Sequence, residues 1–336
     1  MKRFDLLSLA ALVAMAACSS EENLTQPSSD LASSFALASN TWVTKAAPLL
    51  GLFGASAAMA PNAAGESIVY KFGGTDGQGG TGWPVEAYNV DTNSWSMKAS
   101  QVGVFNTNGV GKIGSRLYFS GGSPVVETPS SHSNLLWAYD YTKDKMIQKA
   151  SLPIYSGEGV SGVISGKLYV LPGACSGERY PQPGFCAEER TRRFYQYDPG
   201  TNSWVPRAAA PHYHRSGAAG VINGKLFVAA GFSNFTAVAN LDVYDPASNS
   251  WKTLAAVPAG GRARGAVLGG RFYVVTATGT YAYNPATNTW ISRASPAQGH
   301  DEVVKVTLNG AGRLVAVGGS HGPESEVPND SELYTP

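Results

Sequence analysis

Short apolar runs alternate with polar turns along most of the chain, and one polar turn recurs in nearly the same form. Each copy reads Tyr, then Asp or Asn, then a turn, then Asn-x-Trp, and complete copies occupy residues 88–95, 197–204, 244–251 and 283–290. A degenerate copy at residues 139–146 has Met146 in place of Trp. Asn and Asp favour turns because their side chains hydrogen-bond the nearby backbone, so the pattern predicts paired strands joined by tight turns.

A second pattern alternates with the first. A Gly-Lys or Gly-Arg turn precedes an apolar run that ends in small residues, as at residues 166–170, 224–228 and 270–274. Asn223-Gly224 is a strong hairpin signal because both positions of a type I′ turn need positive φ. Glycine pairs end the run at residues 73–74, 121–122 and 318–319, where missing side chains permit unusual φ or close backbone approach. Each unit therefore supplies about four short strands.

The spacing of the units identifies the architecture. The Trp positions and their Met equivalent, at 95, 146, 204, 251 and 290, lie 39 to 58 residues apart, around the Kelch period of about 50. Diglycine, Tyr-Asp and Asn-x-Trp in this order resemble the Kelch repeat over residues 38–336. The resemblance implies an all-β fold, a β-propeller, in which the repeated Tyr and Trp are scaffold residues packed between sheets.

The two ends of the repeat region each carry half of the motif. Residues 332–336 read Glu-Leu-Tyr-Thr-Pro, whereas residues 38–42 read Ala-Ser-Asn-Thr-Trp with no Tyr before them. Together they make a sixth copy, and pairing them in one sheet removes an exposed edge. We therefore expect a six-bladed propeller rather than a seven-bladed one. Strand 40–45 is expected to share a blade with residues 313–318 and 331–334.

The first residues differ from the rest of the chain. Lys2 and Arg3 precede an apolar run that ends in Ala16-Ala17-Cys18, which predicts a signal peptide at residues 1–17. The small residues before Cys18 resemble the lipobox of bacterial lipoproteins, in which the Cys is acylated, although Met15 stands where Leu is usual. Ordinary signal cleavage is the alternative. We expect an exported lipoprotein of the cell envelope with a flexible linker at 18–37 and the propeller at 38–336.

Composition and charge narrow the possible partners. Charged residues make up 15% of the 336 residues, the formal net charge is +1 and no run of Lys or Arg is present. The sequence therefore lacks the basic footprint of a nucleic-acid-binding protein, and we expect membrane contact through the lipid anchor only. We also expect a monomer.

With Cys18 acylated, Cys175 and Cys186 are the remaining cysteines. They share one long loop at residues 172–193, in a compartment that permits disulfides. We expect them to be bonded. Two cysteines ten residues apart without a nearby His do not make a metal site, so we expect no metal and no cofactor.

Candidate binding residues lie just before the first strand of each unit. In Kelch propellers these segments and the loops between the second and third strands share one face around the central channel, and loops on a rigid scaffold commonly carry function. We select eight residues: Glu158, Tyr213, His214, Arg215, Arg262, Arg264, His300 and Glu302. Three Arg suit a polar or anionic ligand, such as a glycan, a sugar acid or a peptide. The alternative is a set of mutual ion pairs that plugs the channel.

A binding or interaction module is the first functional hypothesis, and an enzyme is the second. The chain is similar in blade number and export to bacterial N-acetylneuraminate epimerase, which mutarotates a sialic acid. That reaction needs an acid, a base and a cation for the carboxylate, and Glu158 and Arg215 are the catalytic candidates, with Arg262 or His300 beside them. No motif beyond the repeat matches that enzyme. Galactose oxidase, another Kelch enzyme, requires a Tyr-Cys crosslink at copper, and we exclude that chemistry here.

Overall fold

The computed structural model describes residues 39–77, 82–124, 132–174, 192–233, 235–319 and 330–336. The chain divides into two compact units, Met1–Leu37 and Ala38–Pro336, and all described residues belong to the second. This part is all-β, and it contains no helix long and apolar enough to cross a membrane.

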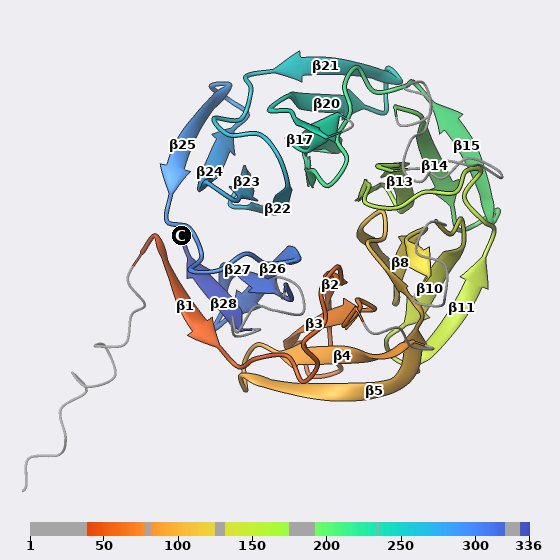
Figure 1. The fold of residues 1–336 in the computed structure, drawn as a ribbon, viewed down its shortest axis with the longest axis vertical. Helices are drawn as coiled ribbons and strands as arrows, with labels where there is room; N and C mark the ends of the chain where they lie inside the picture. Colours follow the sequence, from red (N-terminus) through yellow and green to blue (C-terminus); the bar gives the residue numbers. More distant parts are fainter. Residues whose placement is uncertain (1–38, 78–81, 125–131, 175–191, 234, 320–329) are drawn as a thin grey trace, which may run out of the picture. The chain divides into compact units, whose positions relative to one another are not determined.

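Six antiparallel four-stranded sheets stand as blades around a central axis (Figure 1). From the axis outward, blade 1 contains β2 (Ser56–Pro61), β3 (Ser67–Phe72), β4 (Trp83–Asn89) and β5 (Ser94–Val102). Blade 2 contains β7 (Val110–Ile113), β8 (Arg116–Ser120), β10 (Leu136–Asp140) and β11 (Lys145–Lys149). Blade 3 contains β12 (Val160–Ile164), β13 (Lys167–Leu171), β14 (Phe194–Asp198) and β15 (Ser203–Arg207). Blade 4 contains β16 (Ala218–Ile222), β17 (Lys225–Ala229), β20 (Leu241–Asp245) and β21 (Ser250–Leu254). Blade 5 contains β22 (Ala263–Leu268), β23 (Arg271–Thr276), β24 (Gly279–Asn284) and β25 (Thr289–Arg293).

Blade 6 joins the two ends of the repeat region and confirms the predicted closure. It contains β26 (Glu302–Leu308), β27 (Ala311–Val317), β28 (Ser331–Thr335) and, as its outer strand, β1 (Thr41–Lys45). Thr41 pairs with Thr335 and Lys45 with Ser331. The six-bladed, all-β prediction is thereby confirmed, and the ring has no open sheet edge between its first and last strands.

The repeated motif fastens each blade to its neighbour. In all six blades the hydroxyl of the motif Tyr donates to the side chain of the Asn or Asp that follows, over 2.7–3.0 Å, and in blade 6 Tyr334 finds this partner in Asn40. These acceptors all have φ between 47° and 55°, the left-handed region that Asn and Asp tolerate best. Five motif Trp side chains donate to an Ala carbonyl of the preceding blade, over 2.7–2.9 Å. The repeat is therefore scaffold, as predicted.

The glycine pairs allow the close approach that the sequence predicted. Gly73 and Gly121 have φ of +61° and +67°, and a Cβ on either would lie 1.9–2.0 Å from a carbonyl oxygen of the next blade-to-blade segment. No L side chain fits there. These positions hold the segments that surround one mouth of the channel against the ends of the second strands.

Candidate functional site

The six inner strands surround a cavity at the axis. Strands β2, β7, β12, β16, β22 and β26 all contribute to its wall, which encloses about 320 Å³. Each is the first strand of its blade, so their starting residues meet at one mouth. Polar side chains gather on this wall, namely Ser56, Asn106, Thr107, Glu158, Ser161, Ser216, Arg264, Glu302 and Lys305. A central channel lined in this way can hold a small polar ligand.

A belt of hydrogen bonds encircles this mouth and crosses from blade to blade. Its donor and acceptor pairs are Asn106 N to Gly54 O, Glu158 N to Asn106 O, Ser216 N to Glu158 O, Ala263 N to Ser216 O, and Ala55 N to the Asp301 carboxylate, over 2.7–3.1 Å. Asn106, Glu158 and Ser216 hold φ of 53–55°, which costs on the order of 1 kcal/mol for each such residue. The belt offsets that strain and fixes the backbone from which the mouth side chains project.

Glu158 and Arg215 form an ion pair on this belt. Arg215 Nε donates to Glu158 Oε2 over 2.7 Å, and Ser216 Oγ donates to the same oxygen over 3.0 Å. Burial raises the pKa of the Glu158 carboxyl, but the hydrogen bonds from Arg215 and Ser216, with the positive charges of Arg215 and Arg262, more than offset it and hold the pKa below its usual range. Glu158 is therefore a fixed anion at neutral pH.

Arg262 and Arg264 lie at the same mouth in the next blade, Arg262 just before β22 and Arg264 on β22. Arg264 donates from Nε to the carbonyl of Asp301 and from Nη1 to that of Ala263, and it lines the channel cavity. Both arginines line a second cavity of about 600 Å³, the rim cavity, which shares Asn106, Arg264 and Val303 with the channel cavity. The two cavities therefore meet at Arg264.

Arg262 has no hydrogen bond or ion pair to any residue in the part of the chain that the structure describes. It is exposed at the rim, yet surrounding loops partly enclose it. Burial lowers the pKa of its guanidinium, and the neighbouring charges of Arg264 and Arg215 lower it further against the opposite effect of Glu158 and Asp301. An unpaired cation next to two others is an unfavourable arrangement that an anion would relieve.

Glu302 begins β26 and lines the channel cavity. The side chain is partly buried. No Lys, Arg or His of the described residues lies within ion-pair distance of its carboxyl. Burial raises the pKa of Glu302 to about 7, and Asp301 adds to the rise while Arg264 opposes it. The cavity therefore holds two carboxyls with opposite pKa shifts.

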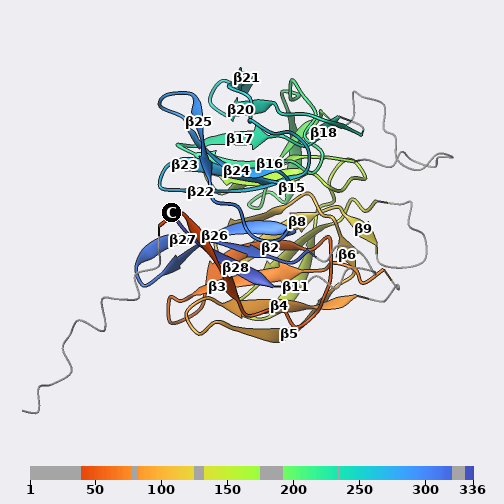
Figure 2. The ribbon, with the colours of Figure 1, turned by 60° about the vertical axis from the view of Figure 1, so that its left-hand side comes forward.

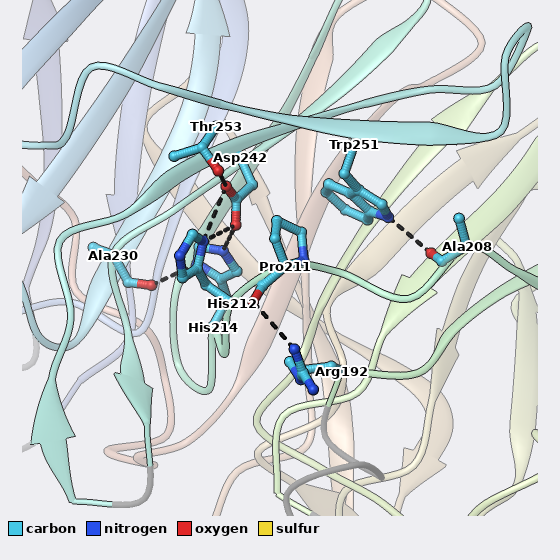
Figure 3. Close-up of polar contacts among 9 residues, drawn as sticks. All are labelled: Arg192, Ala208, Pro211, His212, His214, Ala230, Asp242, Trp251 and Thr253. Atoms are coloured by element: carbon cyan, nitrogen blue, oxygen red, sulfur yellow. Dashed lines mark hydrogen bonds and ion pairs between the residues drawn. The ribbon is translucent and has the colours of Figure 1, made fainter.

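His214 lies in a buried polar cluster (Figure 3). Its Nδ1 lies 2.8 Å from the carbonyl of Ala230 and its Nε2 3.0 Å from Asp242 Oδ2. Both ring nitrogens of His214 are therefore engaged by oxygen atoms of the protein. His212 Nδ1 also lies 2.9 Å from Asp242 Oδ2, and the Thr253 hydroxyl donates to Asp242 Oδ1. The structure thus gives His214, fully buried, a role in fixing the segment before β16 rather than a place in the channel wall.

His300 repeats this arrangement in blade 6. Its Nε2 lies 2.7 Å from Glu332 Oε2 and its Nδ1 3.1 Å from the carbonyl of Gly318, while the backbone N–H groups of Ala297 and Gln298 donate to the same carboxylate. Burial raises the pKa of Glu332, but these hydrogen bonds and the His300 charge outweigh it and lower the pKa overall. His300 lines the rim cavity with a ring whose nitrogens are both engaged.

Tyr213 contributes to neither cavity. Its ring lies under the guanidinium of Arg192, 5.5 Å from the ring centroid. Of the eight selected residues, the structure brings Glu158, Arg215, Arg262, Arg264 and Glu302 to one mouth. Glu158, Arg264 and Glu302 line the channel cavity, Arg262 and Arg264 line the rim cavity, and Arg215 pairs with Glu158. It places Tyr213, His214 and His300 in supporting contacts.

Three mouth residues were absent from the sequence selection. Asn106 lines both cavities, and its place in the loop before β7 was the available signal. His132 lies near Glu158 and Arg215; burial lowers its pKa, with Glu158 opposing and Arg215 adding to that shift. Phe235, exposed by 70%, lies over Arg215 at 5.6 Å from a small hairpin of β18 (Phe232–Ser233) and β19 (Thr236–Ala237).

A second small sheet, β6 (Val104–Phe105) with β9 (Ser123–Pro124), lies on the same side of the ring as β18 (Figure 2). It adjoins Asn106, just as β18 adjoins Arg215 through a bridge to Phe232. The face that carries the mouth residues is therefore the face that carries these extra hairpins.

Several sequence predictions lie outside the described residues. They are the signal peptide, the lipidation of Cys18 and the disulfide between Cys175 and Cys186. Within the described ranges, no group of three or more His, Cys, Asp or Glu side chains is arranged to hold a metal ion.

Comparisons with known proteins agree with the architecture. The family model of the Kelch motif matches residues 215–258. Kelch-like protein 25 of Xenopus tropicalis is 26% identical over 176 residues, which are 51% of this chain. The chain spans about 28% of the length of that relative.

Among solved structures, one described as "Structure of YjhT" is similar with a TM-score of 0.64 and 14% identity, over 85% of this chain and 94% of that one. A likeness at this identity concerns the fold alone.

Proposed function

The chain is a six-bladed Kelch-repeat β-propeller, and we propose that it binds a carboxylate-bearing ligand at one mouth of its central channel. Kelch propellers commonly serve as interaction modules. The ligand's carboxylate would contact Arg262 and Arg264 where the channel and rim cavities meet. Its remaining polar groups would contact Asn106 and the fixed anion Glu158.

The observation that carries the proposal is the unpaired state of Arg262 among the described residues. Its neighbours Arg215 and Arg264 are engaged by Glu158 and by backbone carbonyls. Arg262 lines the rim cavity beside these two cations, and the carboxyls whose charge reaches it, those of Glu158 and Asp301, form no ion pair with it. A carboxylate accepts a guanidinium bidentately, and a charge-assisted pair in an enclosed site is stronger than one in water. Binding would therefore relieve an electrostatic cost that the free protein carries.

Isothermal titration with matched probes tests the proposal. Glucuronate and glucose differ by one carboxylate, and an Asp-rich peptide and its Asn counterpart differ in the same way. We expect binding of at least one acidic probe with little or none of its neutral partner. Arg262→Ala should weaken it about 10- to 100-fold, equal to roughly 1.4–2.8 kcal/mol.

Arg271→Ala is the matched control. Arg271 is an arginine of the same blade, but it lies at the end of β23 away from the rim cavity, which Thr276 at the other end of β23 lines. Equal losses in Arg262→Ala and Arg271→Ala would contradict a site at this mouth. Binding of glucuronate would indicate a sugar-acid ligand, whereas binding of the Asp-rich peptide would indicate an acidic protein segment.

A second candidate function, sugar-acid mutarotation, is favoured by one observation. Glu158 and Glu302 line one cavity with pKa values moved in opposite directions, which is the usual arrangement of a base and an acid. Anomer exchange of N-acetylneuraminate, followed by NMR, tests this candidate. Faster anomer exchange that is lost in Glu302→Gln, while the variant still binds the sugar, would support this candidate. If the sugar binds but exchanges its anomers at the uncatalysed rate, the protein binds without catalysing this reaction.

We further propose that the propeller is displayed at the bacterial cell envelope through an acylated Cys18, with Cys175 and Cys186 joined as a disulfide. Support comes from the order of charged, apolar and small residues before Cys18 and from the single remaining cysteine pair. Mass spectrometry of the exported protein should find a diacylglyceryl group that Cys18→Ser removes. Thiol labelling without reductant should modify neither Cys175 nor Cys186.

A further inference from the structure

Glu302 is a carboxyl without a described partner in the cavity that would receive the anionic ligand. It lines the channel wall beside Arg264, whose guanidinium already donates to two backbone carbonyls. An anion held by Arg262 and Arg264 would therefore stand close to a second acid. Two carboxylates held close together repel each other, and such pairs often resolve the conflict by sharing one proton.

Building on the proposed function, we propose that Glu302 takes up a proton when a carboxylate-bearing ligand binds and then donates a hydrogen bond to that ligand. The ligand arrives ionised, the proton comes from solvent, and the complex carries one shared proton between two acids. Glu302 would thus be the group that makes recognition depend on pH.

The surroundings of Glu302 define which charges act on it. Arg264 faces it from β22 and opposes proton uptake, whereas Asp301, the preceding residue, favours it. Lys305 on the same strand and Glu158 before β12 line the same cavity. Strand β2, on the other side of β26, contributes no titratable side chain. Once a ligand carboxylate occupies Arg264, that guanidinium is shared between the ligand and Glu302, and it opposes proton uptake by Glu302 less.

The free protein is already poised for this step. Burial raises the pKa of Glu302 to about 7, so near neutral pH the carboxyl is about half protonated. A nearby ligand anion raises that pKa further, so the Glu302 carboxyls that are still ionised in the free protein become protonated in the complex. Glu158 in the same cavity does not act in this way, because Arg215 and Ser216 hold it as an anion.

Titration calorimetry in two buffers of different ionisation enthalpy counts the protons. With glucuronate as the probe, or the acidic peptide if only that binds, we expect uptake of about half a proton per ligand at pH 7 and nearly one at pH 8. The affinity should fall toward tenfold per pH unit above pH 7. Glu302→Gln should bind the probe with no buffer dependence and a flat pH profile.

Asp91→Asn, on an exposed turn, is the control and should keep the wild-type uptake. Thermal unfolding of Glu302→Gln verifies that it folds, and Glu302→Ala provides a second variant with the same expected loss of uptake. Binding without proton uptake in the wild type, or uptake that persists in both Glu302 variants, overturns this inference and leaves the proposed function standing. No binding of any acidic probe at any pH overturns both.

Discussion

Two groups of charged residues surround the same mouth and behave in opposite ways. In one group every charge has a partner: Arg215 with Glu158, His214 with Asp242, and His300 with Glu332. In the other group Arg262 and Glu302 have no ion-pair partner among the described residues. Except for Asp242 and Glu332, these residues come from equivalent positions just before or at the start of an inner strand. Residue type and repeat position therefore do not predict which of these charged side chains are paired and which are not.

Removing one member of a fully buried pair should give the largest effect. Glu332→Ala leaves His300, with 3% of its side chain exposed, and the N–H groups of Ala297 and Gln298 without their acceptor. Breaking a buried pair in this way typically costs about 3–5 kcal/mol. Urea unfolding should report a loss of that size. A loss below about 1 kcal/mol would show that the buried pair of His300 and Glu332 contributes no more to stability than an exposed ion pair does.

Acid should remove the contribution of the paired carboxyls together. Interactions with their partners lower the pKa of Glu158, Asp242 and Glu332 in the folded protein. A lowered pKa contributes stability above the unfolded value, about 4 to 4.5, and that stability is lost as pH falls through the folded value. Unfolding free energy measured from pH 6 to pH 3 should fall steeply, and Glu332→Gln should flatten the slope. An unchanged slope would contradict the assignment.

The half-exposed pair on the belt should matter less than the buried ones. Arg215→Ala leaves Glu158 with Ser216 as its remaining side-chain donor, and because both members of the pair reach solvent the expected cost is about 1–2 kcal/mol. Arg262→Ala, the matched variant from the unpaired group, should change unfolding free energy by less than about 0.5 kcal/mol. Equal costs for the two variants would mean that Arg262 is part of a plug.

At Glu302 a substitution should change stability in the opposite direction. The raised pKa of Glu302, about 7, means that stability present below the unfolded value of about 4.5 is lost as pH rises through 7. Glu302→Gln cannot ionise, so it should be more stable than the wild type at pH 8 by about 1–2 kcal/mol, allowing for water in the lumen. The gain should shrink toward pH 5. Destabilisation at pH 8 would show that the ionised carboxylate has a stabilising partner.

The amino-acid sequence by itself determined the ring. Each repeat encodes its own turns through Tyr, Asn and Trp at short fixed spacing, and these local signals are readable because the contacts they make repeat in every blade. Even the closure was readable, because Asn40 and Tyr334 are the two halves of one motif. They meet over 3.0 Å, and the same Tyr–Asn contact spans 2.7 Å in blades 1 and 5. The left-handed φ of the motif Asn follows from the same local chemistry.

Only the tertiary structure decided which mouth residues are free. Glu158 and Arg215 are separated by 57 positions, His214 and Asp242 by 28, and His300 and Glu332 by 32. No local pattern links such residues, since their pairing depends on how adjacent strands and blades meet around the axis. The same holds for the pKa of Glu302, which is set by burial in a cavity that six separate strands enclose. Sequence repeats specify equivalent backbone positions, but the electrostatic environment of each position is a property of the assembled ring.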